Sequence, residues 1–259
     1  MANGKQARLA VLIDADNASA RIVEGLFEEI AKFGSATVRR VYGDFSSASL
    51  GGWVDVLAKH AIAPQQQFAN TKGKNASDIA LVIDAMDLLH SARLDGFCLV
   101  SSDSDFTRLA GRLREEGVEV YGFGEQKTPP SFRQACTRFI YTENLGLAAP
   151  EAVQAPPKRA DLGEARMLVV RAIREVEGEG GWVNLAALGS HLIKLESDFD
   201  PRSYGEKKLS ELVRKFFGFE VRDRDGQLAV RLTTPSSLPE VSQPKPQAKR
   251  APKAPKARD

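Results

Sequence analysis

The chain has 259 residues, 42% of them hydrophobic and 27% charged, a composition typical of folded proteins with room for one sizeable domain and a smaller one. The first apolar run, Leu9 to Ile13, is much shorter than the roughly 20 residues of a membrane span and ends in acids, so we expect a cytoplasmic protein without a membrane segment. Cys98 and Cys136 form no C-x-x-C pair, which argues against a zinc site or a disulfide and predicts two buried thiols.

The formal net charge of +2 is unevenly distributed along the chain. Residues 1–150 carry 16 basic and 18 acidic side chains, residues 151–234 carry 14 of each, and residues 235–259 carry 6 basic and 2 acidic side chains. Only the C-terminal tail is clearly basic. Such a tail can attract a polyanion or simply keep a protein soluble, so charge alone does not identify a partner.

After residues 1–7, which we expect to be disordered, short apolar segments alternate with helical patterns. We predict strands at 9–14, 36–43, 62–68, 96–101, 118–123 and 138–141. We predict helices at 19–33, 51–60, 76–91, 104–116 and 130–136. This alternation indicates an α/β domain over residues 8–146, with a mostly parallel sheet and helices on both faces.

Acidic residues follow two of the predicted strands. Asp14 ends the first strand, and Asp103 and Asp105 follow the fourth. In an open parallel sheet the carboxyl ends of the strands meet at one edge, where ligands bind. We therefore expect these acids to share one site.

A further acid, Asp78, lies in the first turn of the helix predicted at 76–91. The helical repeat places it on the apolar stripe, and rotates Asp84 and Asp87 away from it by about 120° and 180°, onto the solvent side. An inward-pointing Asp78 would join the acidic site. The alternative is that an acid in the first turn simply interacts well with the helix dipole.

Asp14, Asp78, Asp103 and Asp105 together form a set of oxygen ligands, with no histidine or cysteine at ligand spacing. Such hard ligands suit Mg²⁺ or Mn²⁺ rather than zinc. A divalent cation would relieve the mutual repulsion of the carboxylates, activate a water and stabilise charge on a phosphoryl oxygen. The expected chemistry is phosphodiester hydrolysis.

Three motifs occur in a fixed order: Asp-Ala-Asp-Asn at 14–17, Lys-Asn-Ala-Ser-Asp at 74–78, and Ser-Ser-Asp-Ser-Asp-Phe at 101–106. In these motifs residues 8–145 resemble the NYN domain, a branch of the PIN-like ribonucleases that includes the LabA-like bacterial proteins. The resemblance implies a Rossmann-like sheet and a metal-dependent (endo)ribonuclease.

The resemblance also implies roles for single residues. Asp14, Asp78 and Asp103 take the metal-site positions, and Asp105 supports or joins them. Asn17 would orient Asp14 or a water. Asp16 matches more weakly, as a turn or loop residue, and no expected acid is replaced.

Two rival interpretations remain open. Asp14-x-Asp16 after a strand also resembles the haloacid-dehalogenase-like phosphatases, in which the first acid is phosphorylated and the second is a general acid/base. In that family Thr or Val usually follows the second acid by two residues, where this chain has Ala18, and the scheme has no role for Asp78. The other rival is a non-catalytic RNA-binding adaptor whose acids serve metal-dependent binding or stability.

Candidate RNA contacts lie near the acids. Lys72 and Lys74, in the loop before Asp78, could approach the phosphates of a substrate or be ordinary solvated lysines. Trp53, in a segment rich in small residues, could stack on the bases of single-stranded RNA or pack in the core.

Residues 147–162 are rich in proline and alanine and predict a flexible linker. Beyond it, helical stripes at 167–176, 185–192 and 209–216 precede two alternating strands at 219–232 that flank an Asp-Gly turn. Three helices and a terminal hairpin describe a winged-helix (α+β) domain over residues 163–233. Residues 234–259 are rich in proline and basic residues, and we expect them to be disordered.

Within the second domain, the motif Arg202-x-Tyr204-Gly205 and the leucines that follow it resemble the LOTUS domain, also called OST-HTH. The resemblance implies binding to RNA or docking to a protein partner. Arg202, Tyr204, Lys207 and Lys208 are the contacts it suggests. The alternatives are a solvated helix face for the charged residues and a core position for Tyr204.

Overall fold

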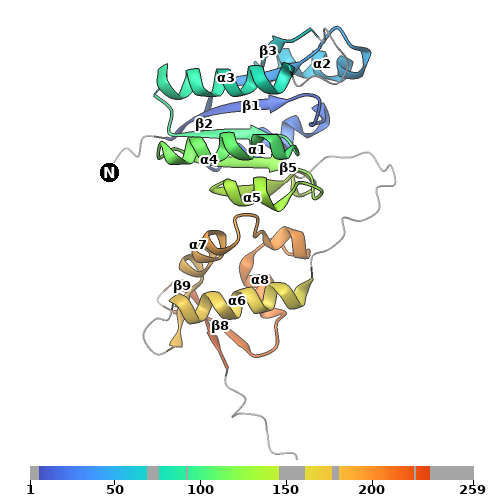
Figure 1. Ribbon diagram of the computed structural model, residues 1–259. Coiled ribbons are helices and arrows are strands. Elements are labelled where there is room, and N and C mark those ends of the chain that lie inside the picture. Colours follow the sequence, from blue (N-terminus) through green and yellow to red (C-terminus); the bar gives the residue numbers. More distant parts are fainter. Residues whose placement is uncertain are drawn as a thin grey trace, which may run out of the picture.

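The computed structural model describes residues 6–68, 76–91, 93–145, 161–176, 181–224 and 226–233, which form two domains (Figure 1). The predicted tail, most of the predicted N-terminal segment and linker, and the candidate contacts Lys72 and Lys74 lie outside these ranges. Among the helices of the described ranges, none combines the length and apolar character that a membrane crossing needs.

The N-terminal domain is built on a six-stranded sheet whose neighbouring strands are all parallel. Its strands are β1 (Arg8–Asp14), β2 (Ser35–Gly43), β3 (Ala63–Gln66), β4 (Gly96–Val100), β5 (Glu119–Gly124) and β6 (Arg138–Tyr141). They lie in the order β3-β2-β1-β4-β5-β6, so the direction of winding reverses between β1 and β4. This reversal is the switch point at which open α/β sheets bind their ligands. The predicted Rossmann-like α/β fold is confirmed.

Helices cover both faces of this sheet. On one face lie α1 (Val23–Ile30) and α2 (Gly51–Lys59), and on the other lie α3 (Ala76–Ser91), α4 (Thr107–Glu115) and α5 (Pro130–Ala135). Alternate side chains of β1 enter the two cores, because successive residues of a strand point to opposite faces. Leu9 and Val11 pack in the core with α1, and Ala10 and Leu12 pack in the core with α3. Both sets are completely apolar, as a doubly covered strand requires.

Three helices begin with a short 3₁₀ turn that the sequence pattern does not separate from the helix. These turns are η1 (Ala20–Ile22) before α1, η2 (Ala48–Leu50) before α2, and η3 (Ser104–Phe106) before α4. Each follows an extended residue whose side-chain oxygen accepts a hydrogen bond from the backbone two residues on: Ser19, Ser47 and Asp103. Asp103 therefore fixes the start of its own helix.

The C-terminal domain contains the predicted three helices and hairpin. Its elements are α6 (Leu162–Val176), β7 (Val183–Asn184), α7 (Leu185–Leu195), η6 (Pro201–Tyr204), α8 (Leu209–Arg214), β8 (Phe219–Arg224) and β9 (Gln227–Leu232). The short strand β7 pairs with β9, giving an antiparallel sheet in the order β7-β9-β8. Gly226 has φ of +79° in the hairpin turn, a conformation that favours glycine.

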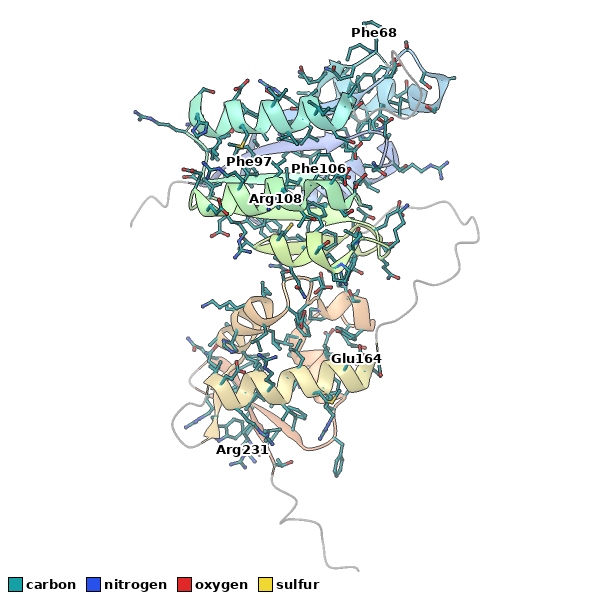
Figure 2. All side chains as sticks on the ribbon, viewed as in Figure 1. Phe68, Phe97, Phe106, Arg108, Glu164 and Arg231 are labelled. Carbon is teal, nitrogen blue, oxygen red and sulfur yellow. The ribbon has the colours of Figure 1, made fainter. Side chains whose placement is uncertain are left out.

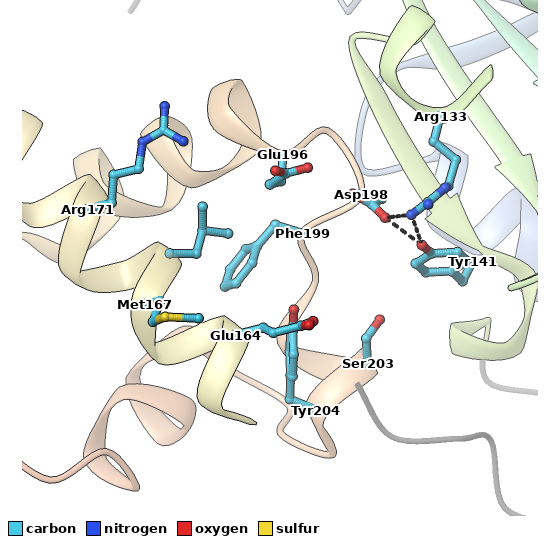
Figure 3. A pocket seen from close by; sticks show the side chains of 11 residues that line it. Arg133, Tyr141, Glu164, Met167, Arg171, Glu196, Asp198, Phe199, Ser203 and Tyr204 are labelled. Atoms are coloured by element: carbon cyan, nitrogen blue, oxygen red, sulfur yellow. Dashed lines mark hydrogen bonds and ion pairs between the residues drawn. The ribbon is translucent and has the colours of Figure 1, made fainter. Parts of the chain in front are cut away.

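The two domains are in contact along β6, the last strand of the large sheet. Asp198 accepts hydrogen bonds from Arg133 of α5 and from the hydroxyl of Tyr141 (Figure 3). The backbone N–H of Phe139 donates to the carbonyl of Ser197 at 2.9 Å. This contact covers part of the edge strand, whose polar groups would otherwise face solvent. A cavity of about 550 Å³ lies between the domains at this point.

A second interdomain contact is formed by Arg202, which we had expected to contact RNA. Its guanidinium donates to Glu29 of α1 at 2.9 and 3.1 Å, to Asp200 at 2.6 Å and to the carbonyl of Asn144 at 3.1 Å. Glu29 and Asp200 are each only 5% exposed. The prediction for Arg202 is therefore wrong, because its donors are committed to holding the two domains together.

Tyr204 also has a structural position. It is half-buried, belongs to the C-terminal core, and its ring centroid lies 5.9 Å from that of Phe199. Burial raises the pKa of its hydroxyl to about 12. Tyr204 thus has the core position that was the alternative to an RNA contact. Lys207 and Lys208 are exposed, and their role as RNA contacts stays a prediction.

Candidate active site

Asp14 lies at the carboxyl end of β1 and is buried, with 1% of its surface exposed. Its Oδ1 accepts from the backbone N–H of Asp16 at 3.0 Å and of Asn17 at 3.3 Å. Its Oδ2 accepts from the Asn17 side chain at 2.9 Å and from the Ser101 hydroxyl at 2.8 Å. Burial raises the pKa of Asp14 even though these donors favour the ionised form. Asn17 thus donates to Asp14 from its backbone and its side chain, and its role in orienting Asp14 stays a prediction.

Ser101 links the two strand ends that carry the acids. It follows β4 and is 2% exposed, and its hydroxyl donates to Asp14 while accepting from the backbone N–H of Asp103 at 3.1 Å. This chain of hydrogen bonds fixes the Asp103 loop relative to β1. The sequence does not distinguish Ser101 from Ser102 and Ser104, the other serines beside the acids. The feature of the sequence that could have identified Ser101 is its position, because it is the first residue after β4, the strand that pairs with β1.

Asp103 and Asp105 form the other half of the acidic edge. Asp103 is half-buried and its Oδ1 accepts from the backbone N–H of Asp105 at 2.8 Å, while Asp105 itself is exposed. Ser102 supports the same loop from the far side, since its hydroxyl accepts from the backbone N–H of Glu125 at 2.9 Å. The loop therefore holds its acids at a fixed place beside β1.

Asp78 lies in the first turn of α3. Its pKa is raised to about 6, first by burial and then by the negative charges of Asp14, Asp103, Asp16 and Asp105. Asp78 is thus close enough to the other three predicted acids, and to Asp16, for their charges to raise its pKa. We call this set the acidic edge: Asp14, Asp16, Asp78, Asp103 and Asp105.

The prediction for Asp84, farther along α3, is wrong. We placed it on the solvent side, but its carboxylate pairs with the Arg40 guanidinium and accepts from the Tyr42 hydroxyl. Both partners belong to β2, and Tyr42 is 1% exposed. The contact ties α3 to the sheet and so fixes the helix that carries Asp78. Asp87 is exposed, as predicted.

The acidic edge offers the oxygen ligands that Mg²⁺ or Mn²⁺ prefers. Like charges gathered in one place make a cation favourable, which the raised pKa of Asp78 expresses. Within the described ranges, no three acidic, histidine or cysteine side chains already stand in an arrangement that could hold a metal ion. Binding of a cation would therefore require the other carboxylates to move toward Asp14.

Of the candidate RNA contacts of this domain, Trp53 lies within the described residues. Trp53 is 2% exposed and packs in the core between α1, α2 and the sheet, so the prediction that it stacks on bases is wrong and the core alternative holds. Lys72 and Lys74 lie outside the described residues.

Comparison with known families agrees with this geometry. A family model described as the NYN domain matches residues 8–145. This chain belongs to the NYN family. A second model, the OST-HTH/LOTUS domain, matches residues 162–227, so both resemblances seen in the sequence are confirmed. NYN domains are PIN-like nuclease domains, and the LOTUS domain is generally an RNA-binding module.

A search of curated proteins found no match. Among solved structures the chain is similar to a protein of unknown function from Vibrio parahaemolyticus, at 17% identity over 54% of this chain and 96% of that one, with a TM-score of 0.45. It is also similar to an uncharacterized protein from Nitrosomonas europaea, at 33% identity over 34% of this chain and 87% of that one, with a TM-score of 0.27.

The Ser101 hydroxyl should stabilise the NYN domain measurably. Ser101→Ala removes the buried donor to Asp14, and a hydrogen bond to a charged group is worth about 1.5–3 kcal/mol. We expect the free energy of unfolding in urea to fall by about 2 kcal/mol. Ser104→Ala, an exposed position in the same loop, is the control and should change it by less than about 0.5 kcal/mol. Equal effects of the two variants would contradict the linking role of Ser101.

Asp78 should destabilise the metal-free NYN domain at neutral pH. The pKa of Asp78 is about 6 in the folded state and 3.8 ordinarily, so ionising this carboxyl costs more in the folded protein than in the unfolded one. The free energy of unfolding therefore falls as the pH rises through about 6. In chelator at pH 7.5, Asp78→Asn should raise the melting temperature by about 3 °C, or about 1 kcal/mol once solvent screening is allowed for. The gain should shrink toward pH 4.

Asp87→Asn, on the exposed side of α3, is the matched control and should leave the melting temperature unchanged. A lower melting temperature for Asp78→Asn at both pH values would show that Asp78 serves the helix dipole instead. The two explanations left open by the sequence are thereby separated.

Proposed function

We propose that this protein is a metal-dependent ribonuclease that hydrolyses RNA phosphodiester bonds at the acidic edge of its NYN domain. The observation that carries the proposal is the gathering of carboxylates from β1, α3 and the β4 loop at the switch point of the sheet. Family membership supports nuclease chemistry in general. The metal and the turnover are part of the proposal.

Asp14, Asp78 and Asp103 would hold Mg²⁺ or Mn²⁺, with Asp105 joining or supporting them. The bound cation would supply a water activated for attack and stabilise charge on the phosphoryl oxygens. Ser101 and Asn17 would keep Asp14 ionised and correctly oriented, because both donate to its Oδ2. Lys72 and Lys74 would balance the charge of the RNA backbone near Asp78.

The C-terminal domain would recruit the substrate. Membership of the LOTUS family supports RNA as the partner of this domain. We propose single-stranded RNA as the substrate. A protein partner that docks on the LOTUS domain is the alternative. Lys207 and Lys208 are exposed at the start of α8 and remain candidate contacts.

The adaptor alternative is favoured by one observation. Both oxygens of Asp14 already accept two hydrogen bonds each, which fills the usual capacity of a carboxylate. In an adaptor the acids would serve this internal network.

The decisive experiment uses the purified protein and an end-labelled single-stranded RNA of about 30 nucleotides, with Mn²⁺, with Mg²⁺ and with chelator. We expect fragments only in the presence of a divalent cation, together with a rise in melting temperature when Mn²⁺ is added. Binding without fragments from several RNAs, and no thermal shift with either cation, would overturn the proposal in favour of the adaptor.

A further inference from the structure

Trp182 lies among three arginines on the sheet of the LOTUS domain. The guanidinium carbons of Arg231, Arg224 and Arg222 lie 4.6, 5.7 and 5.9 Å from the centroid of its ring. All three distances are within the range of about 6 Å over which an aromatic face attracts a cation. We call these four residues the Trp182 patch. The indole holds three positive groups close together, which their mutual repulsion would otherwise separate.

The Trp182 patch faces away from the core of the domain. Register pairs Glu220 with Arg231, and alternate residues of a strand share a face, so Arg222 and Arg224 lie on the same side as these two. The opposite side of the hairpin carries core residues: Phe219, Val221, Val230 and Leu232. The Arg222 and Arg231 side chains keep 64% and 40% of their surface exposed. A ligand can therefore reach the guanidinium groups.

Among the described residues, one carboxylate pairs with the arginines of the Trp182 patch. Glu220 is shared, since it accepts from Arg231 at 2.7 and 2.8 Å and also pairs with Arg222. Within the part of the chain that the structure describes, the patch therefore has three guanidinium groups for one paired carboxylate. The nearby Asp223 lies on the other side of the strand, and its carboxylate accepts from the backbone N–H of Gly226 in the turn.

The positive surface continues toward α8. Arg224 is opposite Gln227 in the hairpin, and Gln227 lines a groove whose other wall includes Lys208. Lys208 is exposed and is one of the contacts predicted from the sequence. An extended polyanion could therefore pass from the patch to the start of α8.

We propose that the Trp182 patch binds the phosphate backbone of single-stranded RNA and is the place where the LOTUS domain holds the substrate. Guanidinium groups suit phosphate because their donors form a planar fork, and the indole orients them before the ligand arrives. Arg231 already lies over the ring, so Trp182 supports the arginines rather than stacking on a base. The inference builds on the proposed function and adds the surface that serves it.

The position of the patch has a consequence for substrate length. Arg231 lies on the side of the LOTUS domain turned away from the NYN domain (Figure 2). An RNA that touches both the patch and the acidic edge must extend along both domains. Variants of the patch should therefore slow the cleavage of RNAs long enough to touch both sites and leave the cleavage of very short ones unchanged.

The test is a binding measurement in chelator, where no cleavage occurs. Fluorescence anisotropy of a labelled single-stranded RNA of about 30 nucleotides is measured at several salt concentrations for the parent and for Arg222→Gln/Arg224→Gln. We expect about 10-fold weaker binding at low salt, and a slope of log K against log salt reduced by about 1.4, since each lost phosphate contact contributes about 0.7. Arg231 is kept so that Glu220 retains its partner.

Arg174→Gln/Arg214→Gln is the matched control, because it removes two exposed arginines from helices of the same domain. It should leave affinity and slope close to those of the parent. Unchanged RNA binding by the patch variant, or an equal loss of binding in the control, would overturn the proposal. Unchanged binding would indicate that the patch contacts a protein partner instead of RNA. The binding measurement does not depend on cleavage. The proposal for the Trp182 patch can therefore be supported in a protein that cleaves no RNA, and refuted in one that cleaves RNA normally.

Discussion

Asp103→Asn should lower the rate of RNA cleavage by at least about 100-fold, or about 2.7 kcal/mol of transition-state stabilisation, while RNA affinity stays within a few-fold of the parent. The change removes one negative charge from the acidic edge and little else. An asparagine Oδ1 can still accept from the backbone N–H of Asp105, and the backbone N–H of residue 103 still donates to Ser101. The fold of the loop is therefore kept while its ligand charge is lost.

Asp103→Asn is a sharper probe than Asp14→Asn. An asparagine at position 14 would turn an amide N–H₂ toward the donors of Asn17 and Ser101, so lost activity could reflect a disturbed core. Asp87→Asn, which removes the same charge from the exposed side of α3, is the control and should cleave at the parental rate. Unchanged cleavage by purified Asp103→Asn protein would remove Asp103 from the site.

The strands and the main acids were predictable because their signals are local. β1 and β4 are buried on both faces and so read as unbroken apolar runs, and Asp14 and Asp103 come at or just after their ends. Asp78 could be found because a helix has a fixed repeat, which put one acid on an apolar stripe. Parallel topology then brought the three together.

The failures share a different cause, which is a partner distant in the chain. The helical repeat placed Asp84 on the solvent side of α3 because it could not show that Arg40 and Tyr42 of β2 meet this residue. Arg202 looked like a surface contact, while its partner Glu29 lies 173 residues away. The Trp182 patch combines residues of β8 and β9 with the residue before β7, so it becomes visible only when the pairing of these strands is known.

Arg202→Met should separate the two domains and destabilise the protein by about 2–4 kcal/mol. The variant leaves Glu29 and Asp200, both 5% exposed, without the guanidinium that offsets their burial. Burial alone would raise the pKa of Glu29, but the hydrogen bonds and charges of Arg202 and Lys32 outweigh it and the pKa is lowered. The stabilisation is therefore complete above about pH 4.5 and is lost as pH falls through the folded-state pKa.

Urea unfolding followed by tryptophan fluorescence can show the separation, because Trp53 reports on the NYN domain and Trp182 on the LOTUS domain. We expect the two signals to diverge in Arg202→Met, and small-angle scattering to show a larger radius of gyration. Lys32→Met is the matched control: Lys32 bonds the same Glu29 at 2.7 Å, but it is 60% exposed and its loss should cost less than about 1 kcal/mol. Equal unfolding curves for the two variants would mean that Arg202 does not hold the domains together. A distinct curve would explain why an arginine in a nucleic-acid-binding module points at another domain: it sets the position of the LOTUS domain relative to the acidic edge.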